Sequence, residues 1–417
     1  MLQSVLLAIT GVLGVLLTVM YAYQVVYLFV PLILKRKNKE KPVKQHRYAI
    51  LIAARNEEKV IGNLLDSIQR QDYPAELFTA FVVADNCTDA TAQIAESHGA
   101  TVFCRFNKRQ VGKGYALEYL LERIEETVGL DTFDAFLVFD ADNVLMPDYL
   151  TQINKTCDAG YDAFTGYRNS KNFGDNWLSA GHAMWYLHDS VHLNLSRQLL
   201  GVSCVVNGTG FGFTRELLRK CGGWHFFTLT EDIEFSTWCV THGVRTGYCH
   251  DAMLFDEQPN KLKVSWNQRT RWAQGGFQIA FRYLKEYRKG LLAGGRTTYS
   301  TLEMLTLSLY GYGLAAVAGV LSVVSVLLSG DPVTIGIAAA SAVAGSYVSM
   351  FFMGALTLLT EWKKIRAGTK GKILGLFTFP LYMLTFLPIS FCAMFRKFEW
   401  TPIAHTVAVT AGDLNKE

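Results

Sequence analysis

The sequence predicts an α/β domain with a mostly parallel sheet, joined to membrane-spanning helices. Half of the 417 residues are hydrophobic and 18% are charged, which indicates a water-soluble domain combined with membrane segments. The first 34 residues contain no charged side chain. From residue 48 onward, short β-rich runs alternate with amphipathic helical patterns, which is typical of βαβ units.

Residues 1–34 are expected to form an N-terminal transmembrane helix, because about 20 apolar residues suffice to cross a bilayer. A cleaved signal peptide fits poorly, since the run is too long and its basic flank follows it instead of preceding it. Seven Lys or Arg lie between Lys35 and Arg47. The positive-inside rule therefore places the N-terminus outside the plasma membrane and the next domain in the cytoplasm.

The cytosolic domain is expected over residues 35–303. Its strands are predicted at 48–54, 78–84 and 134–140, and amphipathic helices lie between them. Ligands of parallel sheets bind at the carboxyl ends of the strands, and the polar motifs of this sequence fall there. The expected fold of this domain is therefore Rossmann-like.

Three further apolar runs, at about 304–328, 333–360 and 373–395, predict C-terminal transmembrane helices within residues 304–396, followed by a tail at 397–417. Pro380 and Pro388 interrupt the last run, which is expected to be kinked or re-entrant. The linker EWKKIRAGTKGK carries five Lys or Arg and is expected on the cytoplasmic side. The protein is therefore expected to cross the membrane several times.

Two other segments have aromatic and apolar residues at near-helical spacing. Either could lie in the headgroup plane or pack on the domain as an ordinary helix, and the neighbouring spans favour the interface. The first is 175–195, and the second runs from Trp272 to Lys289 and mixes aromatic with basic residues. We expect both to be interfacial amphipathic helices in contact with membrane lipids.

Composition and spacing exclude several function classes. The net charge of +4 is too small to indicate a nucleic-acid partner. None of the eight cysteines forms a CxxC pair or a zinc spacing, which indicates reduced cysteines in a cytosolic domain. Gly112-Lys113-Gly114 indicates a flexible loop with one cation near phosphate, but it matches neither the dinucleotide-binding nor the Walker pattern.

Acidic residues follow two of the predicted strands. Asp140 and Asp142 form a DxD pair, in which two carboxylates can hold Mg²⁺ or Mn²⁺ and leave positions for diphosphate oxygens and water. Such a cation would neutralise charge on a diphosphate leaving group. By itself a DxD pair is a weak signal, since acidic turns are common after strands. Asp85 lies in another such loop and could accept hydrogen bonds from a base or a ribose.

Thr230, Glu231 and Asp232 form a second acidic motif. A carboxylate held near an acceptor hydroxyl could take its proton as a sugar is transferred. The same pattern is also typical of a helix N-terminus, with Thr as the cap and acids in the first turn. A capped helix end would fix the carboxylate, so both interpretations can hold together.

Gln268, Arg271 and Trp272 form a QxxRW motif, for which an ordinary amphipathic helix with an interfacial Trp is the alternative. Arg can grip a diphosphate with two hydrogen bonds, and Trp offers a flat apolar face to a sugar ring. Gly208 belongs to Asn-Gly-Thr-Gly at 207–210, which could form the floor of a sugar site, because small residues admit close approach, or could be a plain turn.

The motifs AARNEE, ADNCTD, VFDADN, LTED and QRTRW occur in this order, and together they resemble the membrane-bound family 2 glycosyltransferases. This group includes cellulose, hyaluronan and poly-N-acetylglucosamine synthases and ceramide glucosyltransferase. QRTRWAQGG and the one-plus-three helix plan look most similar to the bacterial poly-β-1,6-N-acetylglucosamine synthases. The resemblance covers essentially the whole chain and implies a GT-A fold for the cytosolic domain. Ala84 stands where the family commonly has a first acid, so the contact of that acid is in doubt.

The resemblance implies a role for each matching residue. Nucleotide and diphosphate binding would fall to Asn56, Glu57, Asp85, Lys113, Asp140, Asp142, Gln268 and Arg271. Asp142 would be the surer metal ligand and Asp140 the second. Asp232 would be the general base, and Trp272, Glu231 and Gly208 would lie at the acceptor.

We therefore expect an inverting, metal-dependent transferase with a UDP-sugar donor, best guessed as UDP-N-acetylglucosamine, that builds an extracellular polysaccharide. Transfer of one sugar to a lipid acceptor uses the same motifs and is the alternative. A catalytically inactive scaffold is disfavoured, because DxD, TED and QxxRW are all intact. Four spans are few for polymer export, so a homo-oligomer or an accessory export subunit is an expected partner.

Overall fold

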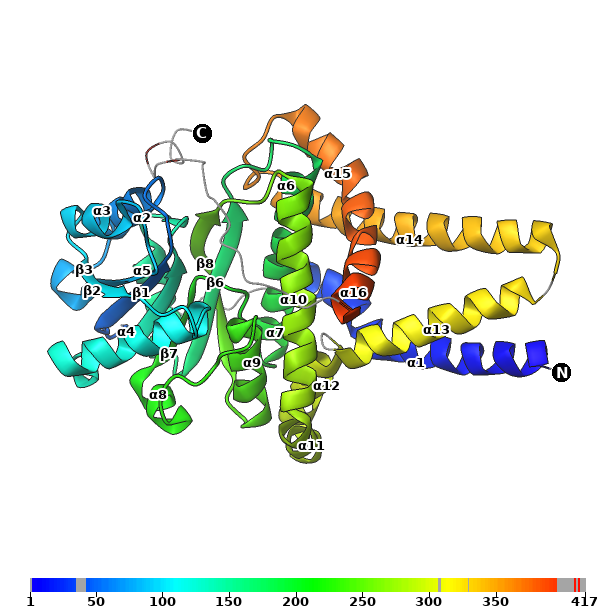
Figure 1. Cartoon of the computed structure of the whole chain (residues 1–417), viewed down its shortest axis with the longest axis horizontal. Coiled ribbons are helices and arrows are strands. Elements are labelled where there is room, and N and C mark those ends of the chain that lie inside the picture. The colour runs from blue at the N-terminus through cyan, green and yellow to red at the C-terminus, as the bar shows by residue number, and fades with distance from the viewer. Residues whose placement is uncertain are drawn as a thin grey trace.

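The computed structural model describes residues 2–34, 43–306, 309–328, 330–395, 409 and 412. The sheet domain lies at one end, and long helices project from the other (Figure 1). Residues 35–42 of the expected basic flank and most of the expected tail at 397–417 lie outside the described residues. The eight cysteines are all free.

One eight-stranded sheet forms the domain, in the order β3-β2-β1-β4-β7-β6-β8-β5. The strands are β1 Tyr48–Ala54, β2 Phe78–Asp85, β3 Thr101–Arg105, β4 Ala135–Asp140, β5 Val144–Leu145, β6 Ala163–Ser170, β7 Phe211–Thr214 and β8 Thr246–Asp256. β1 pairs with β2 and β4 in parallel, and β6 with β8, whereas β7 runs antiparallel to both β4 and β6. The expected mostly parallel sheet and its first, second and fourth strands are confirmed.

The sheet is covered on both faces. The helices of the domain are α2 Ile61–Gln69, α3 Thr91–Ser97, α4 Lys113–Thr127, α5 Tyr149–Asp158, α6 Trp177–His188, α7 Leu195–Leu200, α8 Arg215–Cys221, α9 Glu231–Thr241, α10 Leu262–Arg282, α11 Leu284–Leu292 and α12 Gly295–Thr306. Alternate residues of a strand point to opposite faces. Ile50 and Ile52 accordingly pack on the layer of α2, α3 and α5, whereas Ala49 and Leu51 pack on the layer of α4, α8 and α9.

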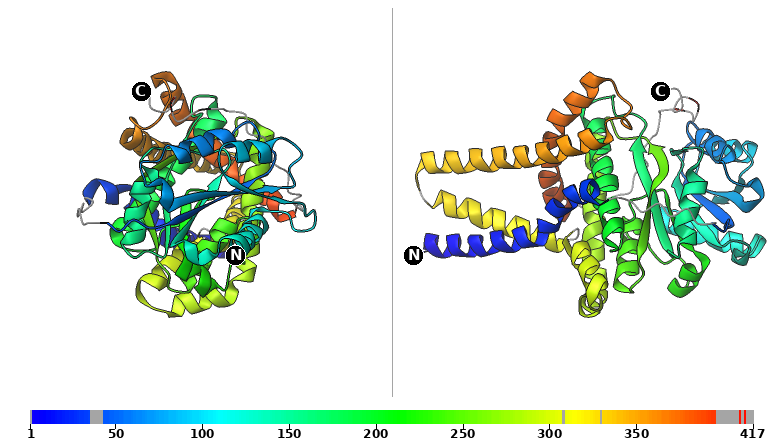
Figure 2. Two further views of the ribbon diagram at one scale, coloured as in Figure 1. Left: turned by 90° about the vertical axis from the view of Figure 1, so that its left-hand side faces the viewer. Right: turned by 180° about the vertical axis from the view of Figure 1, so that it is seen from behind.

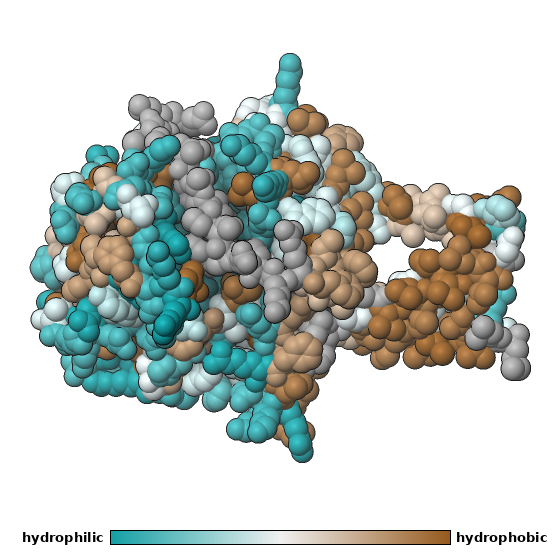
Figure 3. Space-filling view, in the orientation of Figure 1, coloured by the Kyte–Doolittle hydropathy of each residue, from teal (hydrophilic) through white to brown (hydrophobic). Residues whose placement is uncertain are grey.

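The remaining helices are α1 Leu2–Ile33, α13 Leu309–Leu327, α14 Pro332–Glu361, α15 Thr369–Leu384 and α16 Phe386–Phe395. Among the described residues, three segments are long and apolar enough to cross a membrane: Gln3–Ile33, Pro332–Glu361 and Thr369–Phe395. The expected span at 304–328 contains only the shorter apolar helix Gly313–Leu327. α1, α13 and α14 project together and present an apolar surface (Figures 2 and 3).

The last apolar segment is bent, as expected. The helix is interrupted between Leu384 and Phe386, and α15 and α16 run beside α6 and α10 at the root of the projecting helices (Figure 1). Arg269 of α10 holds the bend, because its guanidinium donates to Thr385 Oγ1 at 2.6 Å and lies over the rings of Tyr382 and Phe386. The C-terminal helices are thereby fixed to the catalytic domain.

The two segments expected at the interface differ in burial. Trp177–His188 is almost wholly buried against α15, so the interfacial expectation for 175–195 is wrong, because this segment joins the core between the sheet and the C-terminal helices. The segment Trp272–Lys289 is divided at Tyr283 into α10 and α11, and Phe281 of α10 and Leu284 of α11 are exposed on either side of the break.

Candidate active site

The first two polar motifs meet at the carboxyl ends of β1 and β2. Asn56 has a φ of 59°, and its side-chain oxygen accepts from the Thr88 N–H at 2.8 Å, which joins the two loops. Asp85 is buried and pairs with Arg105 at 2.7 Å. The loop therefore brings Asn56 and Asp85 to one edge of the sheet and gives Asp85 a cationic partner that the sequence did not reveal.

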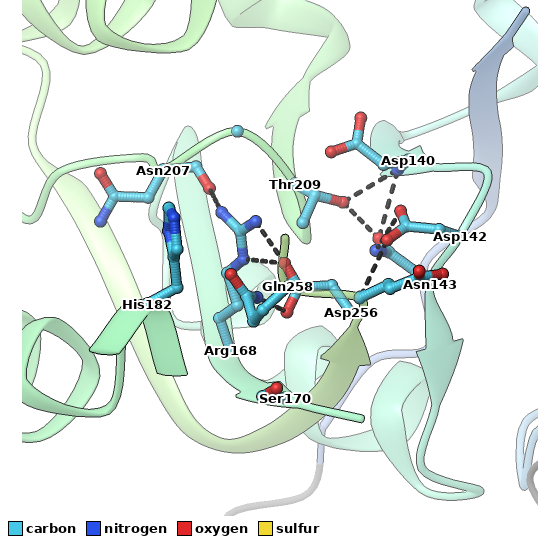
Figure 4. Close-up of polar contacts among 12 residues, drawn as sticks. Asp140, Asp142, Asn143, Arg168, Ser170, His182, Asn207, Thr209, Asp256 and Gln258 are labelled. Atoms are coloured by element: carbon cyan, nitrogen blue, oxygen red, sulfur yellow. Dashed lines mark hydrogen bonds and ion pairs between the residues drawn. The ribbon is translucent and has the colours of Figure 1, made fainter. Parts of the chain in front are cut away.

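The DxD pair forms a tight turn after β4. Asn143 holds this turn, because its side-chain oxygen accepts from the Asp140 N–H at 3.2 Å and from the Thr209 hydroxyl. The Thr209 hydroxyl in turn accepts from the Asp140 N–H at 2.9 Å (Figure 4). The Asp142 carboxylate accepts from the Glu257 N–H at 2.9 Å. Asn143, the residue after the DxD pair, therefore shapes the acidic turn.

Lys113 joins the DxD turn to the Asn-Gly-Thr-Gly loop. Its ammonium lies 2.5 Å from Asp140 Oδ1 and 2.7 Å from the Gly208 carbonyl oxygen. Burial alone would lower the pKa of Lys113, but the carboxylates of Asp140 and Glu231 outweigh burial and raise it. Lys113 is therefore a fixed cation beside the acidic turn.

Thr230, Glu231 and Asp232 lie at the start of α9. Thr230 occupies the cap position but makes no capping hydrogen bond, so the capping interpretation is wrong in detail. Thr230 instead packs on Gly275 of α10, where an added Cβ would come within 2.2 Å of its hydroxyl. Burial, together with the neighbouring Asp232 carboxylate, raises the pKa of Glu231 to about 7, and burial also raises the pKa of Asp232.

Gly208 is adjacent to the α9 carboxylates. Its φ is 80°, a left-handed conformation that favours glycine. A Cβ at this position would lie 3.4 Å from the Arg168 guanidinium and 3.9 Å from Asp232 Oδ2. Gly208 therefore lies next to Arg168 and Asp232, and its expected role as the floor of a sugar site stays a prediction.

The QxxRW motif lies on α10. Trp272 meets the rings of His182 and Tyr186 edge-on, with centroids 5.9 and 6.3 Å apart. Burial lowers the pKa of His182 well below its usual value, so the imidazole is neutral. Its two ring nitrogens form hydrogen bonds with the hydroxyls of Ser265 and Tyr382. The Trp ring therefore has a rigid aromatic backing.

These motifs line one cavity of about 280 Å³. Its lining includes eight of the predicted site residues: Lys113, Asp140, Gly208, Glu231, Asp232, Gln268, Arg271 and Trp272. Asn56, Glu57, Asp85 and Asp142 do not line it. The predicted residues thus divide into a set at the carboxyl ends of β1 and β2, the buried Asp142 of the β4 turn, and a set around the cavity.

The sequence did not indicate Arg168, which also lines the cavity. Its guanidinium donates to Asp256 at 2.6 Å and to the Asn207 carbonyl at 2.9 Å, and it lies 3.7 Å from the Tyr186 ring centroid. Burial raises the pKa of Asp256 to about 6, although Arg168 opposes this shift. No sequence signal marked Arg168, because its strand, Ala163–Ser170, mixes apolar and polar residues and carries no motif.

The site can be tested for its fit to a divalent cation. No group of three or more His, Cys, Asp or Glu within the described ranges could hold a metal. Asp140 faces Lys113, and Asp142 already accepts a backbone hydrogen bond. The two carboxylates therefore fit Mg²⁺ or Mn²⁺ only where a bound diphosphate and water supply the remaining oxygen ligands.

Comparison with known proteins relates the chain to sugar-transferring enzymes. Residues 46–275 match the model of a family described as "Glycosyltransferase like family 2". A β-monoglucosyldiacylglycerol synthase of Nostoc sp. is 26% identical over 376 residues, covering 86% of this chain and 76% of the relative. A poly-β-1,6-N-acetyl-D-glucosamine synthase of Staphylococcus epidermidis is 24% identical over 237 residues, covering 56% of this chain and 55% of the relative.

A solved structure shares the fold. It is a mannosyltransferase of Pyrobaculum calidifontis in complex with GDP-Man and Mn²⁺, and its TM-score is 0.58 at 17% identity. The match covers 93% of this chain and 98% of that protein. The likeness therefore extends over both the sheet domain and the helical part of the molecule.

Proposed function

The chain belongs to glycosyltransferase family 2, and from this premise we propose that it transfers one sugar from a nucleotide-diphosphate sugar to a hydroxyl of a membrane lipid. Enzymes of this family use nucleotide sugars. Lipid transfer was the alternative that the sequence left open, and the lining of the cavity now favours it over polymer synthesis.

One observation carries the proposal: charged and large apolar side chains line the same cavity. The charged ones include Lys113, Asp140 and Arg271, and the apolar ones are Leu193, Val205, Ile233, Phe277 and Phe386. Phe386 belongs to α16, part of the candidate span Thr369–Phe395. An acceptor with an apolar body could therefore enter from the membrane side and present its hydroxyl to the charged side chains.

The residues support an inverting displacement. Asp232 would remove the proton of the acceptor hydroxyl while that oxygen forms a bond to the anomeric carbon of the donor. The bond from this carbon to the diphosphate breaks, and the diphosphate leaves with the electron pair. Lys113 and Arg271 would stabilise the negative charge on the leaving group, while the side-chain NH2 group of Gln268 would donate to it and orient it.

The remaining predicted residues would hold the donor. Asn56, Glu57 and Asp85 would contact the nucleotide, and Asp85 is positioned by Arg105. Asp140 and Asp142 would hold Mg²⁺ or Mn²⁺, which supplies positive charge at the diphosphate. Trp272 would stack on the acceptor, with Glu231 and Gly208 beside it. We propose UDP-sugars as donors, and the name of the Nostoc relative favours UDP-glucose over UDP-N-acetylglucosamine.

The arrangement of the helices supports a cytoplasmic catalytic domain at the plasma membrane. The N-terminal end of α1 and the connection between α13 and α14 lie far from the sheet domain, whereas the linker after Glu361 lies beside it (Figure 1). The basic side chains of this linker, including Lys363, Lys364 and Arg366, are therefore on the side of the sheet domain. The positive-inside rule places this side in the cytoplasm.

Polymer synthesis is the second candidate, because a named relative is a poly-β-1,6-N-acetyl-D-glucosamine synthase. A growing polysaccharide would have to cross the membrane beside the projecting helices, and a homo-oligomer or an accessory export subunit would then complete the channel. The homo-oligomer and the export subunit stay predictions. The product of the purified enzyme separates the two candidates.

The test uses purified full-length protein in nanodiscs that contain diacylglycerol, with radiolabelled UDP-glucose or UDP-N-acetylglucosamine and Mg²⁺. We expect an organic-extractable monosaccharide adduct, and its initial rate of formation should be at least about 100-fold lower with Asp232→Asn. A product of high molecular weight that lengthens with time would support the polymer. Nucleotide-sugar binding without transfer to any lipid or sugar acceptor would contradict both candidates.

A further inference from the structure

A second cavity, of about 860 Å³, lies between α1, α11 and α12, away from the catalytic motifs. We define this groove by Val19 and Met20 of α1, Leu284 and Arg288 of α11, and Leu302 and Glu303 of α12. Its lining is predominantly aliphatic and aromatic. Several of these apolar side chains are exposed to the surroundings, including Val19 at 69% and Leu302 at 49%.

The groove lies where α1 leaves the sheet domain. Tyr27, two turns further along the helix, is 1% exposed. The Tyr27 hydroxyl bonds to that of Tyr299 at 3.0 Å, and the Tyr23 hydroxyl to that of Thr306 at 2.8 Å, so hydrogen bonds fix α1 to α12. These hydrogen bonds pre-form the groove, and α1, which forms one of its walls, is a candidate membrane span.

Basic side chains follow one edge of the groove. Lys285, Arg288 and Lys289 of α11 are exposed, and Glu286 is the one acid between them. None of the three cations forms an ion pair within the described part of the chain, whereas the nearby Arg282 is paired with Glu234. A basic helix with exposed apolar side chains at a membrane surface attracts anionic lipid headgroups.

The groove also adjoins the catalytic cavity. Glu303 lines the groove, and its carboxylate lies 3.3 Å from Arg197, which lines the catalytic cavity. Both side chains are almost fully buried, and Arg197 Nη2 and Glu303 Oε2 lack hydrogen-bond partners. One buried ion pair therefore separates the two cavities.

We propose that this groove binds an anionic glycerophospholipid of the bilayer. One acyl chain would occupy the space between α1, α11 and α12, and the phosphate would lie on Arg288, supported by Lys285 and Lys289. The lipid is distinct from the acceptor, because it lies outside the catalytic cavity. Its occupancy would fix α1 against α11 and would support the Arg197–Glu303 pair from the groove side.

The proposal can be tested without measuring catalysis. The probe is phosphatidylglycerol with a photoactivatable group in one acyl chain, placed in phosphatidylcholine nanodiscs with the full-length protein. We expect cross-links to peptides of α1, α11 and α12. A phosphatidylcholine probe of the same acyl structure should give a markedly lower yield, because it lacks net charge.

Two variants separate charge from shape. Arg288→Gln should lower the cross-link yield at limiting probe about fivefold, which corresponds to the loss of one cation near a membrane surface. Lys363→Gln removes an exposed cation that does not line the groove and should leave the yield unchanged. Leu302→Trp should fill the groove and abolish the cross-link while retaining the charge, and Leu302 is exposed enough for the fold to tolerate it.

Three results would overturn the proposal. The first is equal labelling by the two lipid probes. The second is an unchanged yield in Arg288→Gln, and the third is labelling spread evenly over α1, α13 and α14. Catalytic activity enters none of these readouts, so they are independent of the proposed lipid transfer.

Discussion

Asp232→Asn is expected to lower the turnover number ~10²–10⁴-fold and to leave the dissociation constant of the nucleotide sugar nearly unchanged. Asn keeps the shape of Asp but cannot accept the acceptor proton. A loss of this size corresponds to about 2.7–5.5 kcal/mol in the barrier. The Asp232 carboxylate lies in the first turn of α9 beside Gly208, where an acceptor hydroxyl can reach it.

The neighbouring Glu231 influences how far the turnover number of Asp232→Asn falls within the ~10²–10⁴-fold range. Glu231 also lines the cavity, and burial, together with the Asp232 carboxylate, raises its pKa, so it is a second basic carboxylate beside Asp232. It can replace part of the lost basicity, so we expect a loss toward the lower end of the range. The double variant with Glu231→Gln should then lose more than Asp232→Asn alone.

The assay measures initial rates at saturating donor and, separately, donor binding by isothermal titration calorimetry. Asp131→Asn is the matched control, because this carboxylate is exposed and lies outside the cavity. Near-wild-type turnover in Asp232→Asn, with binding intact, would refute the assignment of Asp232 as the base. Loss of donor binding as large as the loss of turnover would refute the separation of the two roles.

Further predictions follow from the same contacts. The rate should fall as the pH is lowered, because burial raises the pKa of the Asp232 base and protonates it at a pH where an exposed Asp is still ionised, and Glu231→Gln should move this limb to lower pH by removing a neighbouring carboxylate. EDTA should abolish sugar transfer, and Asp142→Ala should have the same effect, because it removes an oxygen ligand of the metal. Full activity in metal-free buffer would contradict the assignment of the DxD pair as a metal site. Gly275→Ala should lower the thermal unfolding temperature, because overpacking against Thr230 costs about 1–3 kcal/mol. In Lys363→Cys, the new thiol should react with a membrane-impermeant thiol reagent only from the cytoplasmic side. Reaction of this thiol only from outside would overturn the topology.

Local sequence patterns predicted much of the first half of the fold. The strands at 48–54, 78–84 and 134–140 appear as β1, β2 and β4 within one or two residues. Apolar runs bounded by polar turns carry enough information for this, because both faces of a central parallel strand are buried. Strands β3, β5, β6, β7 and β8 were not predicted. Two of them, β5 and β7, have only two to four residues, which leave no measurable period.

The sequence predicted which residues belong to the site, but it did not predict which of them contact one another. Motif spacing pointed to Lys113, Asp140, Asp232 and Arg271, and these four line one cavity. Their separation along the chain gave no distance, because strand order decides which loops meet. The pairing of Lys113 with Asp140 therefore became visible only in the structure.

The sequence by itself determined that this chain has a soluble α/β domain and apolar helices, because hydropathy and period are properties of contiguous residues. The tertiary structure decided which apolar helices remain exposed: α6 is buried under α15, whereas α1 projects. It also decided the partners of single buried charges, such as Arg168 with Asp256 and Arg269 with Thr385. A buried charge must be satisfied by groups distant in sequence, and only the packing of strands and helices brings those groups within reach.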